Sequence, residues 1–319
     1  MPAKMLFQGE DRKGIIHIKG AEIKKRKEKQ RMKEFVIVTE LTSDLPDEYV
    51  KEHGIKIVPL YYKFDDEIIY GDEKNLDPKE FYARMRNGEM PQTMAANPDF
   101  VRKALTEIVE SGKDILYIAF SSGLSSSADT AAMVANEMAP EYPDSKIIVV
   151  DSLCASLGQG LLVDKAVKQQ AAGKSIDEIA DWLEKNKLHL SHQFTVDDLF
   201  HLHRGGRVSK ATAVVGTLIN VKPVLHVDDE GHLIALRNVR GRKKSITSLV
   251  DNMLKEMEGY DNDTIFISHG DCYEDAQFLA QLVTEKTGIT DILINYVCPT
   301  IGAHSGPGTL ALFFMGEHR

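Results

Sequence analysis

Three consecutive serines, Ser125 to Ser127, are the first residues in this 319-residue sequence whose types and spacing could do chemistry. They follow the apolar segment 114–120 (DILYIAF) and precede a helix-like segment, 128–138. Where a parallel strand ends and a helix begins, unpaired backbone N–H groups favour an anion, and serine hydroxyls can donate hydrogen bonds to a carboxylate. Two other interpretations stay open from spacing alone. Ser125 could cap the helix, or act as a nucleophile, although no base lies near it in the sequence.

Two polar segments could add hydrogen-bond donors to such an anion site. Thr93 lies in the loop 91–98 (PQTMAANP), which on its own is typical of a turn followed by a helix cap. The segment 203–209 (HRGGRVS) places two glycines, which allow close backbone approach, before Arg207, whose guanidinium binds anions with a fork of N–H groups.

Two further segments carry cations or an imidazole. In 238–245 (NVRGRKKS), Arg240 and the basic residues after it stand where a helix should begin. Cations oppose the helix dipole at that end, so a phosphate or an acidic partner explains them better than helix stability does. In 301–308 (IGAHSGPG), His304 is surrounded by glycine and proline, and we expect a rigid glycine-rich loop that holds one imidazole in a site, although a packed turn would give the same pattern.

Motifs for nucleotides and metals are missing from the sequence. The segment 173–175 (GKS) ends like a phosphate-binding P-loop, but Lys168 stands where that loop needs its first glycine, and HExxH, GxSxG and GxGxxG do not occur. No cysteine or acid joins the clustered histidines at ligand spacing, so we expect ordinary surface or interface histidines at His189, His192, His201 and His203. The sequence predicts neither a cofactor nor a metal.

The elements that must position these residues begin as an alternating pattern. Short β-branched runs at 34–39, 55–60, 114–120 and 146–151 are separated by helical patterns. Asp77-Pro78, Asn97-Pro98 and the box Ser175-x-x-Glu178 mark helix starts. Four strands alternating with helices predict a parallel sheet covered on both faces.

The second half has another rhythm. Strands near 221–227 and 232–238 flank the turn DDEG, and two later strands, at 263–268 and 291–297, alternate with helices near 242–257 and 273–287. We therefore expect an α/β protein in three parts: a disordered basic extension over 1–33, an α/β domain over 34–173, and an α+β domain with a mixed or antiparallel sheet over 174–319.

Composition and charge narrow the classes of partner. The chain is 43% hydrophobic and 27% charged, with no apolar stretch long enough for a membrane span or a secretory signal, and its three cysteines are far apart, so we expect a cytoplasmic protein with reduced thiols. Residues 1–31 carry ten Lys and Arg and four acidic residues, a net charge of +6. Because the whole chain has a net charge of −9, the remaining residues carry −15. So acidic a body disfavours nucleic acid as a partner. The run 24–33 (KKRKEKQRMK) could bind anionic lipid, in transient contact with a membrane surface, or nucleic acid; we favour a solvated tail, or an upstream start before a natural Met32.

In this order the segments resemble the DegV family, whose characterised members include the fatty acid-binding subunits of bacterial fatty acid kinase. The resemblance covers essentially all of 34–319. Six pieces carry it: VTELTSDLP, SSGLSSS, DLFHLHRGGRVS, VKPVLHVDDEGHL, VRGRKK and IGAHSGPG. Departures are Glu40-Leu41 where the family usually has Asp-Ser, TMAANP in place of TSQPSP, and Ser126-Ser127 in place of Gly-Thr.

The resemblance implies two α/β domains that hold one long-chain fatty acid between them. Thr93 and Ser125 would bind its carboxylate, with Ser126 beside them and His304 close by. Arg207 and Arg240 match arginines at or near the head-group mouth, where an ATP-dependent fatty acid kinase docks and phosphorylates the carboxyl group to an acyl phosphate for phospholipid synthesis. This chain would supply no ATP site and need no cofactor. Which of the three serines contacts the carboxylate stays open.

Two functions of other classes remain as alternatives. The first is a stand-alone acyl-processing enzyme that uses Ser125 or His304 as nucleophile or base, against which the missing triad-type motif argues. The second is a DNA-related regulatory role through the basic extension.

Overall fold

The computed structural model describes residues 33–65, 69–71, 74–197, 199–209 and 220–319. Residues Phe35–Arg319 form one compact unit, which holds all the elements below. The predicted basic extension, 1–33, falls almost wholly outside the described residues, so its disorder stays a prediction. No helix in the described part is long and apolar enough to cross a membrane.

The first sheet is wholly parallel, as predicted. Its strand order is β2-β1-β6-β7, and the four expected strands are confirmed as β1 Phe35–Glu40, β2 Lys56–Val58, β6 Asp114–Ala119 and β7 Ile147–Asp151. Every residue of β6 is buried because helices cover both faces. One face packs on α4 Pro98–Glu110 and α5 Ser127–Met138, and the other on α6 Leu157–Ala171 and α7 Ile176–Asn186. The short α2, Asp47–Glu52, follows the 3₁₀ turn η1 Leu41–Ser43.

Side chains close to a helix start in sequence fix several of these boundaries. Asp77 and Asn97 each accept a hydrogen bond from the backbone N–H two residues on, at 2.9 and 2.8 Å. Ser175 and Glu178 form the reciprocal capping box at the start of α7. Such contacts span only a few residues, so the sequence predicts them correctly.

A small antiparallel sheet, β4-β3-β5, is formed by residues that lie between β2 and β6 in the sequence. Its central strand, β3 Tyr62–Lys63, pairs with β4 Ile69–Tyr70 on one side and with β5 Gln92–Thr93 on the other. The sequence suggested only a turn at Thr93, so β5 was not expected. With α3 Pro78–Arg86 these strands build an aromatic cluster around Tyr62 and Phe81.

The second large sheet is mixed, with the order β10-β9-β8-β13-β11-β12, in which only β11 and β12 pair in parallel. The expected strands are β9 Val221–Val227, β10 Leu233–Arg240, β11 Ile265–His269 and β12 Ile292–Tyr296, while the sequence did not predict the central β8 Leu190–Thr195 and β13 Leu310–Met315. The described helices that follow β8 are α8 Phe200–Arg204, α10 Arg242–Glu256, α11 Tyr273–Thr287 and α12 Pro299–Ser305, and the 3₁₀ turn η2, Lys187–His189, precedes β8.

Helix α12 corrects one prediction. Residues 301–308 were expected to form a loop, but 299–305 are helical: Pro299 occupies the first helical position, and Gly306, with φ of 81°, ends the helix. Position 302, inside the helix, requires glycine because a side chain there would meet Tyr82, whose hydroxyl oxygen lies 2.5 Å from the position of an added Cβ. The glycines and the proline mark helix ends and a close packing contact.

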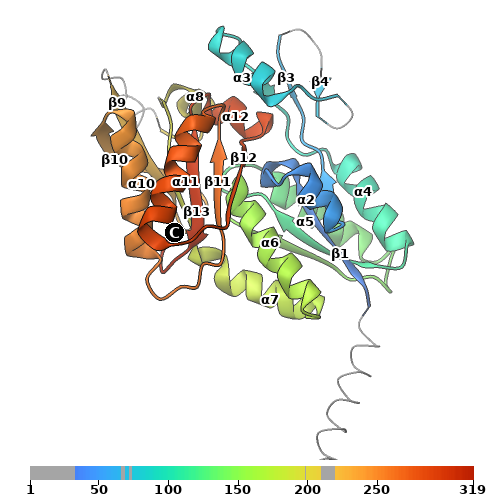
Figure 1. The fold of residues 1–319 in the computed structure, drawn as a ribbon. Coiled ribbons are helices and arrows are strands. Elements are labelled where there is room, and N and C mark those ends of the chain that lie inside the picture. The colour runs from blue at the N-terminus through green and yellow to red at the C-terminus, as the bar shows by residue number, and fades with distance from the viewer. Residues whose placement is uncertain (1–32, 66–68, 72–73, 198, 210–219) are drawn as a thin grey trace, which may run out of the picture. The chain divides into compact units, whose positions relative to one another are not determined.

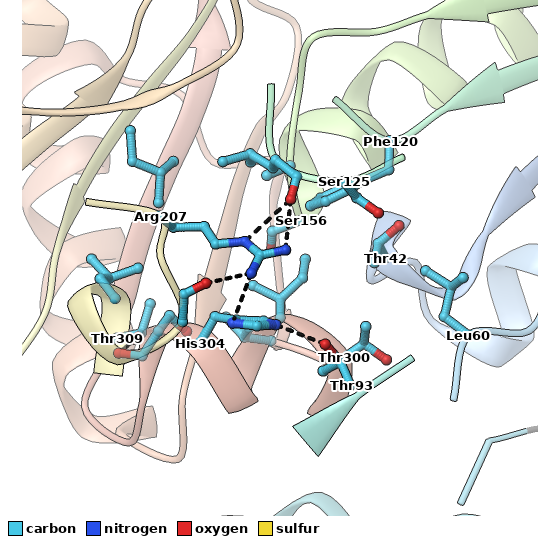
Figure 2. A pocket seen from close by; sticks show the side chains of 18 of the residues that line it. Thr42, Leu60, Thr93, Phe120, Ser125, Ser156, Arg207, Thr300, His304 and Thr309 are labelled. Atoms are coloured by element: carbon cyan, nitrogen blue, oxygen red, sulfur yellow. Dashed lines mark hydrogen bonds between the residues drawn. The ribbon is translucent and has the colours of Figure 1, made fainter. Parts of the chain in front are cut away.

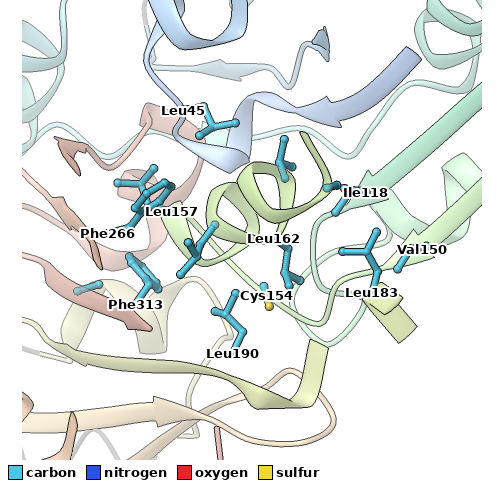
Figure 3. Packing of buried hydrophobic residues seen from close by; sticks show 14 of the residues in the cluster. Leu45, Ile118, Val150, Cys154, Leu157, Leu162, Leu183, Leu190, Phe266 and Phe313 are labelled. Atoms are coloured by element: carbon cyan, nitrogen blue, oxygen red, sulfur yellow. The ribbon is translucent and has the colours of Figure 1, made fainter. Parts of the chain in front are cut away.

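Helix α6 joins the two large sheets (Figure 1). Figure 3 shows its Leu157 and Leu162 between Ile118 of the parallel sheet and Phe313 of the mixed sheet. The opposite face of the mixed sheet packs under α10 and α11. The parallel sheet ends before residue 173 and the mixed sheet begins after it, and a domain boundary at 173–174 stays a prediction.

Candidate functional site

A cavity of about 470 Å³ lies where the carboxyl ends of the parallel strands meet the mixed sheet. Residues just after all four parallel strands line it: Thr42 after β1, Leu60 after β2, Phe120 after β6 and Ala155 after β7. This edge is where open parallel sheets generally bind ligands, and the volume falls within the usual range of small-molecule pockets. Apolar residues of the mixed sheet form part of the remaining wall, among them Phe194 of β8 and Phe313 of β13.

Five of the six candidate residues line this one cavity: Thr93, Ser125, Ser126, Arg207 and His304. They come from β5, the loop before α5, the segment after α8, and α12. Arg240 is exposed at the end of the edge strand β10 and is not part of the lining. The structure thus brings together residues that lie as much as 211 positions apart, and leaves Arg240 outside the cavity.

A chain of polar contacts crosses the site (Figure 2). Thr93 Oγ1 lies 2.8 Å from His304 Nε2, and Arg207 Nη1 makes a longer contact of 3.5 Å with His304 Nδ1. The guanidinium is held in place by the carbonyl oxygens of Leu124, at 2.8 and 3.2 Å, and of Gly205. Gly205 also makes room for the imidazole, because an added Cβ would stand 2.2 Å from His304 Nδ1.

These contacts assign the hydrogen on His304. Burial, together with the charges of Arg207 and Arg204, lowers the pKa of His304 to about 4, so the ring is neutral at pH 7. A guanidinium can only donate, so Nδ1 accepts and the network places the ring hydrogen on Nε2, which donates to Thr93 Oγ1. The Thr93 hydroxyl can then turn its own hydrogen into the cavity. The result is a donor suited to an anion.

The serine loop combines a cap with a cavity wall. Ser125 Oγ lies 3.0 Å from Ser127 Oγ and accepts the Ser127 N–H at 3.3 Å, so Ser125 helps to cap α5. Ser126 occupies the N-cap position without a side-chain capping bond and is exposed. Ser125 and Ser126 line the cavity, whereas the buried Ser127 is not part of the lining. The capping and anion-binding interpretations of this loop are therefore compatible.

Helix α12 also supplies two hydroxyls that the sequence did not single out. Thr300 and Ser305 line the cavity and are only 8% and 6% exposed, and neither side-chain oxygen has a hydrogen-bond partner among the residues described. Thr300 lies one helical turn before His304, on the same side of the helix, and Figure 2 shows it beside Thr93. A prediction of helix over 299–305 would have paired the two by their spacing.

Comparisons with known proteins show which family the chain belongs to. A family model described as "Uncharacterised protein, DegV family" matches residues 34–317. The chain belongs to the DegV family. The DegV domain-containing protein CPE0026 of Clostridium perfringens is 45% identical over 287 residues, which cover 90% of this chain and 99% of the relative.

Two solved structures are similar in fold. One is a fatty acid-binding DegV-family protein from Thermus thermophilus. It has a TM-score of 0.80 and 29% sequence identity, and the match covers 89% of this chain and 99% of the Thermus chain. The other, a stearic acid-binding protein from Eubacterium ventriosum, has a TM-score of 0.82 and 25% identity over 89% of this chain and 98% of its own.

Two acids in the DegV opening segment lie behind the cavity wall. Burial raises the pKa of both Glu40 and Asp44 to about 7. Glu40 Oε2 accepts hydrogen bonds from the Phe120 N–H at 2.9 Å and from Gln159 at 2.7 Å, which ties β1 to β6 and α6. Asp44 accepts from the Cys298 N–H at 3.0 Å, so it joins the parallel sheet to the segment before α12.

One predicted feature outside the cavity, the basic start of a helix near 242, has a structural explanation. Arg242 begins α10, as expected, but its guanidinium donates to Asp275 at 2.7 Å, so an acid of the same chain balances its charge. Lys243 and Lys244 are exposed. The described part of the chain contains no group of histidine, cysteine or acidic side chains placed to hold a metal ion.

Proposed function

We propose that this DegV-family protein binds one long-chain fatty acid in the cavity and presents its carboxylate to a separate ATP-dependent fatty acid kinase, which converts it to an acyl phosphate. Thr93, Ser125 and Ser126 would donate to the carboxylate, and His304 and Arg207 would orient them. The observation that carries the proposal is the convergence of hydroxyls, a neutral imidazole and a guanidinium on one largely apolar cavity.

The energetics of fatty acid binding suit a cavity that has an apolar lining and a polar end. Burying roughly 16 methylenes at about 0.8 kcal/mol each gives on the order of 12 kcal/mol before ordering costs, so the hydrocarbon tail alone can provide tight binding. An isolated carboxylate in an apolar pocket is costly, so it requires several donors. The hydroxyls of Thr300 and Ser305, which have no partner among the residues that the structure describes, add to the donors in this cavity.

The Thermus and Eubacterium relatives support the same class of ligand, because both are described as binding a fatty acid. The kinase step rests on the family resemblance and on the exposed basic residues Arg240, Lys243 and Lys244, which lie together in sequence at the start of α10 and suit an acidic partner surface.

The geometry favours a carrier over a stand-alone acyl enzyme. A serine nucleophile requires a base within hydrogen-bonding distance. Ser125 Oγ is bonded within its own loop to Ser127, while the two nitrogens of His304 face Thr93 and Arg207. Incubation with acyl esters tests the alternative, since turnover without any partner protein would establish the enzyme and refute the carrier.

Native mass spectrometry of the purified protein tests ligand binding directly. We expect one co-purifying fatty acid per chain, and rebinding of one equivalent after the lipid is removed. In the second step the loaded protein is incubated with fatty acid kinase and ATP, and the acyl phosphate is trapped with hydroxylamine. A chain that neither carries nor rebinds a fatty acid would refute the proposal; a chain that binds but is never phosphorylated would refute the kinase step alone.

A further inference from the structure

The cavity floor is built from rows of side chains on the mixed sheet. β13 and β8 are antiparallel, and their register places Ala311 opposite Phe194 and Phe313 opposite His192. All four line the cavity. The next pair in the same register and on the same face, Met315 and Leu190, belongs to the packed core under α6 and does not line it. The floor is therefore two rows deep and ends at the Phe313 row.

The direction along β13 is fixed by its start. Thr309, the residue before the strand, lines the cavity and bonds through Oγ1 to the carbonyl oxygens of Ser305 and Gly306 at the end of α12, beside His304. Successive residues of β13 thus run away from the polar end of the cavity. Ala311 comes first and Phe313 lies about 7 Å deeper, at roughly 3.4 Å per residue.

The deeper row, His192 and Phe313, presents an apolar surface to the cavity although it contains a histidine. His192 is buried, its Nε2 accepts the Ala155 N–H at 3.2 Å, and its Nδ1 faces the Leu190 carbonyl oxygen at 3.2 Å. Both nitrogens are therefore satisfied within the protein. The ring stacks edge-to-face with Phe313 at a centroid distance of 5.3 Å. This row therefore forms an apolar wall at the deep end of the cavity floor.

This wall cannot shift readily. Gly158 of α6 touches the imidazole so closely that an added Cβ would stand 2.3 Å from His192 Nε2. Phe313 is 2% exposed and packed in the core cluster that α6 shares with both sheets. Close-packed interiors have little room to relax.

We propose that Phe313, backed by His192, is the stop that sets the length of the bound acyl chain, and that the small side chain of Ala311 keeps the preceding stretch of the tunnel open. This inference rests on the proposed function. An extended chain advances about 1.3 Å per carbon, given C–C bonds of about 1.5 Å, so one row of about 7 Å corresponds to roughly five carbons. Truncating Phe313 should free part of that row, and enlarging Ala311 should block it.

The test measures the affinity of the delipidated full chain for saturated straight-chain acids from twelve to twenty-two carbons. Phe313→Ala should move the preferred length upward by about two to four carbons, and Ala311→Leu should move it downward by a similar number. Phe313→Leu and Ala311→Val serve as milder variants in case the larger changes prevent folding. The two substitutions should therefore act in opposite directions.

Phe314→Ala is the matched control. Phe314 is the next residue, equally buried, but it packs on the opposite face of the sheet, under α10 and α11. An unchanged preference in the Phe313 and Ala311 variants, while the parent chain binds with a clear optimum, would overturn the inference. An equal shift in Phe314→Ala would overturn it too, because loosened packing alone would then explain the change. Failure of the parent chain to bind any of the acids would instead refute the proposed function.

Discussion

Replacing Thr300 by valine should stabilise the protein without ligand and weaken its hold on a fatty acid. Thr300 Oγ1 is buried in the cavity wall and has no hydrogen-bond partner among the described residues. Valine has nearly the same shape and a similar helix propensity, so the change removes one hydroxyl and little else. The two effects have opposite signs because the same hydroxyl is unsatisfied in the protein alone and, in our proposal, satisfied by the carboxylate.

The magnitudes follow from general hydrogen-bond energetics. A buried unsatisfied polar group costs about 1–3 kcal/mol, so the ligand-free variant should gain about 1 kcal/mol or more, which raises the melting temperature by about 2 °C in a chain of this size. A hydrogen bond to an ionised carboxylate contributes about 1.5–3 kcal/mol. Its loss should weaken fatty acid binding by roughly 10- to 100-fold.

The assay is thermal unfolding of the delipidated chain with and without saturating fatty acid, combined with a direct affinity measurement. Thr309→Val is the matched control, because Thr309 lines the same cavity but its Oγ1 bonds to two carbonyl oxygens, at 3.1 and 2.8 Å. That variant should melt below the parent. A Thr300→Val protein that melts no higher than the parent and retains its affinity would refute the reasoning.

Three further predictions concern pH, the carboxylate donors and the docking surface. Burial raises the pKa of Glu40 from 4.5 to about 7, so this group stabilises the fold fully below pH 4.5 and loses that contribution as pH rises through 7; Glu40→Gln should remove about 3 kcal/mol of this pH dependence. Urea unfolding at pH 4.5 and pH 8 measures the difference in the free energy of unfolding between parent and variant, in which the contributions of the buried histidines cancel. An equal difference at the two pH values would contradict the prediction. Ser125→Ala and Thr93→Ala should each weaken fatty acid retention or phosphorylation about 10- to 100-fold, with Ser122→Ala, an exposed serine of the same loop, unaffected; unchanged lipid content and phosphorylation in both variants would count against these assignments. Arg240→Glu should impair phosphorylation by the kinase while the bound lipid remains, and full activity would exclude a docking role.

The sequence predicted those parts of the fold that are specified by local signals. The four parallel strands are β-branched runs bounded by turns, and the helix starts at Asp77, Asn97 and Ser175 depend on contacts two or three residues away. The family match likewise follows from short segments read in order. Each of these is a property of neighbouring residues.

The central strand β8 shows why other parts could not be predicted. Its residues Ser191 and Gln193 are fully buried, which the sequence LSHQFT does not suggest. They are satisfied by α10, where Glu256 accepts from Ser191 Oγ at 2.8 Å and Asn252 donates to Gln193 Oε1 at 2.6 Å. Partners some sixty residues away in the chain make this polar segment a core strand.

The sequence by itself determined five of the polar residues of this site, Thr93, Ser125, Ser126, Arg207 and His304, and the family. Only the tertiary structure decided that Thr93 contacts His304, which lies 211 positions later in the chain, and that Arg207 sets the hydrogen on that imidazole. It also decided that the Thr300 hydroxyl finds no partner in the described part of the chain. The tertiary structure alone also decided how deep the cavity reaches along β13. The physical reason is that caps and turns depend on neighbouring residues, whereas a cavity and its hydrogen-bond network depend on surfaces that meet only when the sheets and α6 pack together.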